Sequence, residues 1–170
     1  MKALLERYPD EVQAILARYP EGQKRSAVMP LLYLAQREQG VITLKDMAEI
    51  GELTGIEITE VGSIVGFYTL YHDSGPRFRV QVCTDLPCAL RGADEFLKHL
   101  CENVGVRVGE PTPDGALVIE EVTCLAGCHH APMFQLQGDG EITYHEDQTV
   151  ESAAEMIAEL RRRAAGGAHD

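Results

Sequence analysis

The segment RFRVQVCTDLPC, residues 77–88, marks the point at which the pattern of the chain changes from helical to strand-like. Its first seven residues alternate between polar and apolar types, as a half-buried strand does. Its end carries two cysteines separated by four residues. A second close pair stands in CLAGC, residues 124–128, after 35 intervening residues. The sequence therefore predicts a strand that ends in one half of a four-cysteine site.

The pattern after this segment indicates an α/β domain over residues 73–170. Helical spacing returns in GADEFLKHLCENVG and again in the closing segment TVESAAEMIAELRRRA. Between them, ALVIEEVTC, MFQLQ and EITYHE read as strands, and the turn GDG joins the last two as a hairpin. The order β-α-β-β-β-α is compatible with a thioredoxin-like layer, in which helices pack on one sheet.

Residues 1–72 show almost no strand pattern and predict a small helical bundle. One helix is expected to open with a capping box of Thr43 and Asp46 and to stop at Gly55, and another to stop at Gly40. A fourth is expected to have Thr59 as its N-cap and to turn Tyr68 inward. The four expected helices are EVQAILARY, QKRSAVMPLLYLAQREQG, TLKDMAEIGELTG and TEVGSIVGFYTLY. The fold class is thus α+β, with a helical bundle before a thioredoxin-like domain.

Composition and charge restrict the classes of partner. The chain has 170 residues, is 45% hydrophobic and carries a net charge of −12, so it can form a core but suits neither nucleic acid nor an anionic membrane surface. The start MKALLERYPDEVQ lacks the apolar centre of a signal peptide, and no apolar stretch is long enough to span a bilayer. We expect a cytoplasmic protein without direct membrane insertion, in a compartment that disfavours disulfides.

The spacing of the cysteine pairs allows several kinds of site, and they are not equally favoured. A dithiol of the thioredoxin type needs C-x-x-C, which neither pair has. A structural zinc site usually uses tighter C-x₂-C pairs, although wider spacing occurs. The plant-type ferredoxin spacing is also absent. Four thiolates supplied by two loops are what a [2Fe–2S] cluster needs, so the spacing favours this cluster and leaves zinc as the alternative.

Four segments of the chain resemble a known family. They are AVMPLLYLAQREQGVIT, EVGSIVGFYTLY, VQVCTDLPCALRGADE and EEVTCLAGCHHAPMFQL. Together they are similar to the thioredoxin-like [2Fe–2S] ferredoxin subunit of the NADH–quinone oxidoreductase (complex I) family, over about residues 10–160. The same module is found in NAD-linked hydrogenases and formate dehydrogenases, which remain alternative parent complexes.

The resemblance implies a ligand set, a partner and a role. The cluster ligands would be Cys83, Cys88, Cys124 and Cys128, and we expect the first pair to bind one iron and the second pair the other. The partner would be a larger flavoprotein subunit that binds NADH and FMN. The chain itself has no G-x-G-x-x-G after a strand, which agrees with a subunit that lacks a complete active site. The resemblance implies electron transport by one-electron exchange with FMN, and a position peripheral to the inner membrane through the complex.

Other polar and aromatic residues have simpler interpretations. Cys101 falls on the apolar stripe of a helix and is expected to be a buried, inert thiol. His129 and His130 follow Cys128 directly, but four cysteines already complete the site, so packing around the site or plain exposure is expected. Thioredoxin folds often have a cis-proline where Pro132 stands, although trans is the better expectation for a single X-Pro bond.

Overall fold

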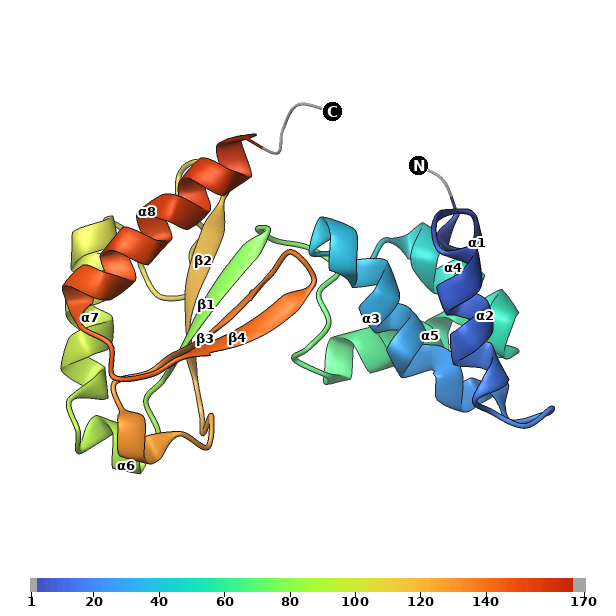
Figure 1. The fold of residues 1–170 in the computed structure, drawn as a ribbon, viewed down its shortest axis with the longest axis horizontal. Helices are drawn as coiled ribbons and strands as arrows, with labels where there is room; N and C mark the ends of the chain where they lie inside the picture. Colours follow the sequence, from blue (N-terminus) through green and yellow to red (C-terminus); the bar gives the residue numbers. More distant parts are fainter. Residues whose placement is uncertain (1–2, 167–170) are drawn as a thin grey trace. The chain divides into compact units, whose positions relative to one another are not determined.

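A computed structural model describes residues 3–166 of the protein. The chain forms two compact units, Met1–Gly75 and Pro76–Asp170, and each has a hydrophobic core of its own. Within residues 3–166, no helix is long and apolar enough to cross a membrane. Figure 1 shows that the first unit is built from helices, whereas the second combines helices with a sheet.

Two helices of the first unit end at glycines that adopt the left-handed conformation. Gly40 and Gly55 have φ angles of 71° and 74° at the C-caps of their helices, as the sequence predicts. The elements are α1 (Leu4–Arg7), α2 (Pro9–Ala17), the 3₁₀ turn η1 (Lys24–Ala27), α3 (Val28–Gln39), α4 (Leu44–Thr54) and α5 (Ile58–Phe67). The short α1 is an addition to the four predicted helices. The predicted helix QKRSAVMPLLYLAQREQG starts too early, because its first turn is the 3₁₀ turn η1 and α3 begins only at Val28.

One predicted cap of this unit is present and another is wrong. The hydroxyl of Thr43 accepts a 3.2 Å hydrogen bond from the N–H of Asp46, whose carboxylate accepts one of 2.9 Å from the N–H of Thr43. The capping box at the start of α4 is therefore confirmed. Thr59, however, lies inside α5, because that helix begins at Ile58 after Glu57. Tyr68 is 41% exposed rather than inward, since α5 ends at Phe67 and Tyr68 turns into extended backbone.

The second unit has a four-stranded sheet in the order β2-β1-β3-β4. Strand β1 pairs in parallel with β2 and antiparallel with β3, and β3 forms the predicted hairpin with β4. The elements are β1 (Phe78–Cys83), α6 (Leu86–Ala89), α7 (Ala93–Val104), β2 (Leu117–Val122), the 3₁₀ turn η2 (Cys128–His130), β3 (Phe134–Gly138), β4 (Glu141–His145) and α8 (Val150–Gly166). The order of helices and strands is the predicted one, with α6 and η2 added.

Strand alternation decides which face of the sheet the helices cover. Phe78, Val80 and Val82 point to one face of β1, where they share a core with apolar residues of α7 and α8. Figure 1 shows these two helices side by side along the sheet. The intervening residue Gln81 takes part instead in a polar network, in which its side chain bonds the side chains of Glu120 and Gln135. As β1 is a central strand, its last residue, Cys83, is held from both sides.

Candidate metal centre

Cys83 is fixed by the pairing of the central strand. Its N–H donates a 3.3 Å hydrogen bond to the carbonyl oxygen of Met133, which directly precedes β3. The N–H of the next residue, Thr84, donates one of 3.1 Å to the carbonyl oxygen of Val122, the last residue of β2. The Cys83 side chain is 1% exposed. Backbone bonds to both neighbouring strands therefore hold the first thiol of the site at the end of β1.

Cys88 lies on the short helix α6, which sequence patterns did not predict. The helix forms because the carboxylate of Asp85 accepts a 3.0 Å hydrogen bond from the N–H of Leu86 and Pro87 follows in the first turn. Cys88 is fully buried, whereas Leu86 and Leu90 are 69% and 80% exposed. The helix thus turns its sulfur inward, whereas Leu86 and the C-cap residue Leu90 face outward.

The second cysteine pair lies on a loop with unusual backbone angles. Strand β2 ends at Val122, two residues before Cys124. Cys124 and Ala126 have φ angles of 27° and 61°, which residues other than glycine rarely adopt. Cys124 is exposed and Cys128, at the start of η2, is half-buried. Gly127 stands between them with little space, because a Cβ there would lie 2.4 Å from the sulfur of Met133.

Three of the four predicted thiols meet in one small cluster. Cys83 and Cys88 are buried in it and Cys128 packs against it. Burial is the main cause that raises the pKa of Cys88 to about 12, and the neighbouring thiols of Cys83 and Cys128 raise it further. Cys124 is exposed and is not a member of this cluster. In the part of the chain that the structure describes, no group of three or more His, Cys, Asp or Glu side chains could hold a metal ion as it stands.

The wall around the three thiols is apolar. It includes Ala93 from the start of α7, and Ala131 and Met133 from the segment before β3, all of them buried. Sequence reasoning missed these three residues, because alanine and methionine at such positions resemble any other core residue. Soft thiolate donors beside buried apolar side chains suit iron–sulfur chemistry. The chemistry of the donor set therefore fits a [2Fe–2S] group.

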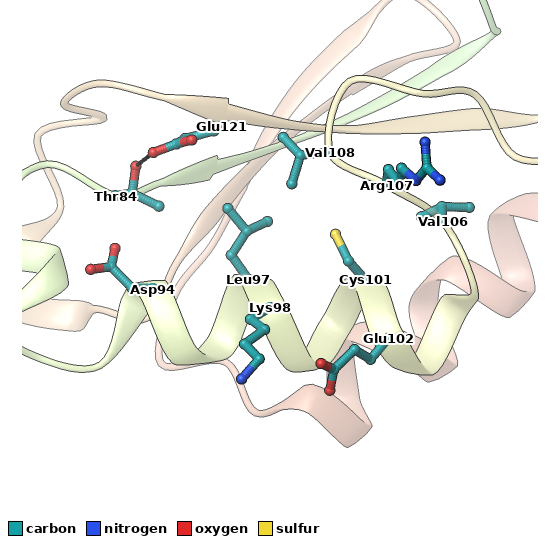
Figure 2. Close-up of a pocket in the computed structure, with 10 residues that line it drawn as sticks. All are labelled: Thr84, Asp94, Leu97, Lys98, Cys101, Glu102, Val106, Arg107, Val108 and Glu121. Atoms are coloured by element: carbon teal, nitrogen blue, oxygen red, sulfur yellow. Dashed lines mark hydrogen bonds between the residues drawn. The ribbon is translucent and has the colours of Figure 1, made fainter.

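The fifth cysteine lies apart from this cluster. Cys101 is on α7, is 7% exposed and has a pKa raised by burial. It lines a cavity of about 510 Å³ whose wall also includes Leu97 and Val108. Figure 2 shows its sulfur pointing from α7 towards the segment with Val106 and Val108. The prediction of a buried thiol outside the four-cysteine group is confirmed.

Of the two histidines after Cys128, His130 faces carboxylates, and the two imidazole rings contact each other. Nδ1 of His130 lies 2.7 Å from a carboxylate oxygen of Asp147, and its ring centroid is 4.1 Å from that of His129. His129 is exposed and His130 is half-buried. The Ala131–Pro132 bond just beyond them is cis, so the expectation of a trans bond is wrong. The free-energy preference of an X-Pro bond for trans is small enough for surrounding structure to override it.

Comparison with known proteins places most of the chain in one family. Residues 12–161 match the thioredoxin-like [2Fe-2S] ferredoxin family. The chain is 38% identical to a subunit of an NADH-quinone oxidoreductase from Rhizobium meliloti, over 92% of this chain and 95% of that protein. It is 37% identical to a subunit of the NADH-quinone oxidoreductase from Thermus thermophilus, over 89% of this chain and 83% of that protein.

A solved structure supports the same fold. The crystal structure of an NAD⁺-reducing [NiFe]-hydrogenase in the air-oxidized state has a TM-score of 0.63 with this chain, at 15% identity, over 85% of this chain and 24% of that one. At this identity the likeness concerns the fold alone. The match to residues 12–161 contains both cysteine pairs. The two relatives align with this chain over most of their own lengths. The chain belongs to the thioredoxin-like [2Fe-2S] ferredoxin family.

Proposed function

We propose that this chain is the electron-transfer subunit of an NADH–quinone oxidoreductase. Its cluster ligands in this proposal are Cys83, Cys88, Cys124 and Cys128. The observation that carries the proposal is the meeting of three of these thiols in one buried cluster, in a chain whose family match spans all four. When bound, the [2Fe–2S] group supplies one-electron chemistry, and its exchange partner in this proposal is FMN on a separate flavoprotein subunit.

The residues of this chain have distinct tasks in the proposed site. Cys83 is held in place at the end of β1, because its strand pairs on both sides. Cys88 is presented by a helix that Asp85 caps, with its sulfur buried. Cys124 would complete the donor set from the loop after β2. The apolar side chains of Ala131 and Met133 exclude water from the inner side of the site.

In this proposal, this chain and its flavoprotein partner bind different cofactors. The sequence has no nucleotide-binding fingerprint, so NADH and FMN would bind to the flavoprotein partner. Relatives named as NADH-quinone oxidoreductase subunits support membership of such a complex. We also propose that the chain is cytoplasmic and lies peripheral to the inner membrane, which it would approach only through its complex.

Two other assignments are less well supported. An NAD-linked hydrogenase or a formate dehydrogenase could contain the same module, and the hydrogenase structure shares its fold. The identity to that structure is 15%, whereas the identity to the two oxidoreductase subunits is 37–38%. A structural zinc site built from the same four cysteines would make the chain an adaptor without redox chemistry.

Metal analysis and absorption separate these functions. The chain, purified without oxygen and in its complex, should contain iron and acid-labile sulfide in equal amounts, about two of each per chain, and should absorb visible light. Zinc in place of iron, with no visible absorption, would contradict the proposal. Identification of the co-purified subunits then distinguishes the parent complexes: a quinone-reducing complex is expected, and a hydrogenase or formate dehydrogenase large subunit would favour the alternative.

A further inference from the structure

The helical unit carries an apolar groove of about 410 Å³ between α2, α3 and the segment after α5. We call it the α2–α3 groove. Its lining consists of Ile15, Arg18, Met29, Pro30, Tyr33, Leu34, Arg37, Leu70 and Tyr71. Two arginines belong to this lining and no carboxylate does, although the chain has 27 acidic against 15 basic side chains. The groove is therefore a basic, apolar site on a strongly acidic protein.

The floor of the groove is buried and fixed in place. Leu34 and Tyr71 are each 4% exposed. The hydroxyl of Tyr71 donates to the carbonyl oxygen of Met29 at 2.9 Å. The side chain of Gln36 donates to the carbonyl oxygen of Leu70 at 2.8 Å and accepts from the N–H of His72 at 2.7 Å. These bonds attach the segment after α5 to α3, so the groove is formed before any partner binds, which lowers the entropic cost of binding.

The types of side chain in the groove are those of protein–protein interfaces. Tyrosine, methionine and arginine are enriched in the centres of such interfaces, and lysine, glutamate and aspartate are depleted there. Tyrosine and arginine also supply a large share of the residues whose truncation costs the most binding energy. Tyr33 is 39% exposed at the rim of the groove, where a partner could cover it. The lining thus favours a protein segment as the occupant.

The two arginines differ in the charge that they offer to a partner. Arg37 donates to both carboxylate oxygens of Glu11, at 3.1 and 2.9 Å, and lies 4.8 Å from the ring centroid of Tyr8. Its charge is therefore compensated and its position is fixed. Arg18 is exposed and forms no ion pair within residues 3–166. The unbalanced charge at the groove is the guanidinium of Arg18, and a carboxylate is its complement.

We propose that the α2–α3 groove binds an acidic amphipathic segment of another subunit of the oxidoreductase complex. Apolar side chains of that segment would enter the groove, and one of its carboxylates would pair with Arg18. The identity of the partner as a subunit of this complex rests on the proposed function. The chemistry of the segment rests on the groove itself: an apolar floor, an uncompensated arginine at the rim and no carboxylate in the lining.

Site-specific crosslinking in the assembled complex tests the occupant. Tyr33 is replaced by the photoreactive residue p-benzoylphenylalanine, the complex is purified through this chain and irradiated, and the crosslinked peptide is identified by mass spectrometry. The expected peptide belongs to another subunit, has more acidic than basic residues and contains large apolar side chains. A crosslink to a second copy of this chain, to a basic segment, or to no other subunit would overturn the proposal.

A pair of charge reversals tests the role of Arg18. Arg18→Glu should weaken retention of the crosslinked subunit about tenfold at low salt, with a smaller difference at high salt, because salt screens exposed charges. Arg25→Glu is the matched control: its side chain is 69% exposed in the same unit, outside the groove, and pairs with exposed Glu60. Retention that is equal in the two variants would contradict the proposal.

The visible spectrum and iron content test the proposed function, whereas retention of the partner subunit tests the groove, so the two proposals can fail independently. Both variants change surface charges in the helical unit, so their iron content and absorption should equal those of the wild type. If the wild-type chain contained no iron, the proposed function would fail, but unequal retention of Arg18→Glu and Arg25→Glu would still support the groove. If iron is present and retention is equal, the groove proposal alone is wrong.

Discussion

The hydroxyl of Tyr71 donates a 2.9 Å hydrogen bond to the carbonyl oxygen of Met29 and thereby links the segment after α5 to α3. The ring is 4% exposed, and burial, followed by the charge of nearby Tyr68, raises the pKa of Tyr71 from its ordinary 10.0 to about 12. The hydroxyl is therefore a neutral donor over a wider pH range in the folded chain than in the unfolded chain. This difference links the stability of the helical unit to alkaline pH.

Raising the pH should destabilise the helical unit through Tyr71. Above pH 10 the unfolded chain loses the phenolic proton while the folded chain retains it until about pH 12, so the free energy of unfolding falls across this window. The difference between the two pKa values corresponds to roughly 3 kcal/mol at most. Below pH 10 the contribution of this group is constant. Urea unfolding followed by helical circular dichroism from pH 8 to pH 12 measures the loss.

Two phenylalanine variants isolate this contribution. Tyr71→Phe should lose about 1 kcal/mol at pH 8, because the hydrogen bond to Met29 is absent, and should show a shallower fall in stability above pH 10. Tyr33→Phe removes a hydroxyl from a side chain that is 39% exposed, and should keep the wild-type pH dependence. An unchanged alkaline slope in Tyr71→Phe would show that other groups cause the fall.

The close approach of Gly127 to Met133 predicts a sensitive position between the second pair of cysteines. A Cβ at Gly127 would lie 2.4 Å from the sulfur and 2.8 Å from the terminal methyl group of Met133, so Gly127→Ala must displace a side chain that is 1% exposed. We expect destabilisation of about 1–3 kcal/mol and a reduced iron content, because the loop that carries Cys128 shifts.

A second glycine serves as the control for this substitution. Gly66 lies inside α5, and a Cβ there would have no neighbour within 4 Å, so Gly66→Ala should leave the iron content unchanged and slightly stabilise the helix. Iron content and thermal unfolding of the two variants, measured side by side, check the expectation. Equal iron content in Gly127→Ala and the wild type would mean that the loop tolerates the added methyl group.

Negative charge near the first cysteine pair predicts a low reduction potential. Residues 73–170 hold 17 acidic and 8 basic side chains, and Asp85 lies between Cys83 and Cys88. Reduction adds an electron to an already anionic centre, so acidic surroundings oppose it. We expect a midpoint nearer the plant-ferredoxin value of about −400 mV than the Rieske range. Redox titration followed by electron paramagnetic resonance measures it, and a midpoint above zero would contradict this argument.

Asp85→Asn removes the charge at this position but keeps a cap for α6. The side-chain oxygen of asparagine can still accept the hydrogen bond from the N–H of Leu86. The midpoint should rise by about 20–40 mV, which corresponds to a partly screened interaction of roughly 0.5–1 kcal/mol for one electron. Asp85→Lys should raise it further. A downward shift in either variant would show that local charge does not control the potential.

Sequence patterns predicted the fold well where one local signal decided the outcome. Few residue types can form a capping box or a tight hairpin turn. The structure contains both predicted features, the capping box of Thr43 and Asp46 and the turn around Asp139. The ends of α5 were predicted less well. The start of that helix depends on backbone bonds to Glu57, and its end at Phe67 turns Tyr68 outward, which no apolar period specifies.

The candidate site also combines features that local sequence signals predicted with features that they did not. Cysteine spacing and predicted strand ends identified the segments that contain the four cysteines, because both features depend only on residues close together in the sequence. The helix around Cys88, the exposure of Cys124 and the wall formed by Met133 depend on contacts between distant segments. The cis bond before Pro132 likewise follows from tertiary context, since its intrinsic preference is small.

The paired variants Cys124→Ser and Cys101→Ser test the proposed ligand set most directly. Cys124 is the proposed ligand outside the buried cluster, whereas Cys101 is a buried cysteine outside the set. Iron and labile sulfide content, with the paramagnetic resonance spectrum of the reduced protein, should change in Cys124→Ser, because a serine oxygen is a poor substitute for a thiolate on iron. They should match the wild type in Cys101→Ser. A wild-type cluster in Cys124→Ser, or equal damage in Cys101→Ser, would contradict the assignment of the four ligands.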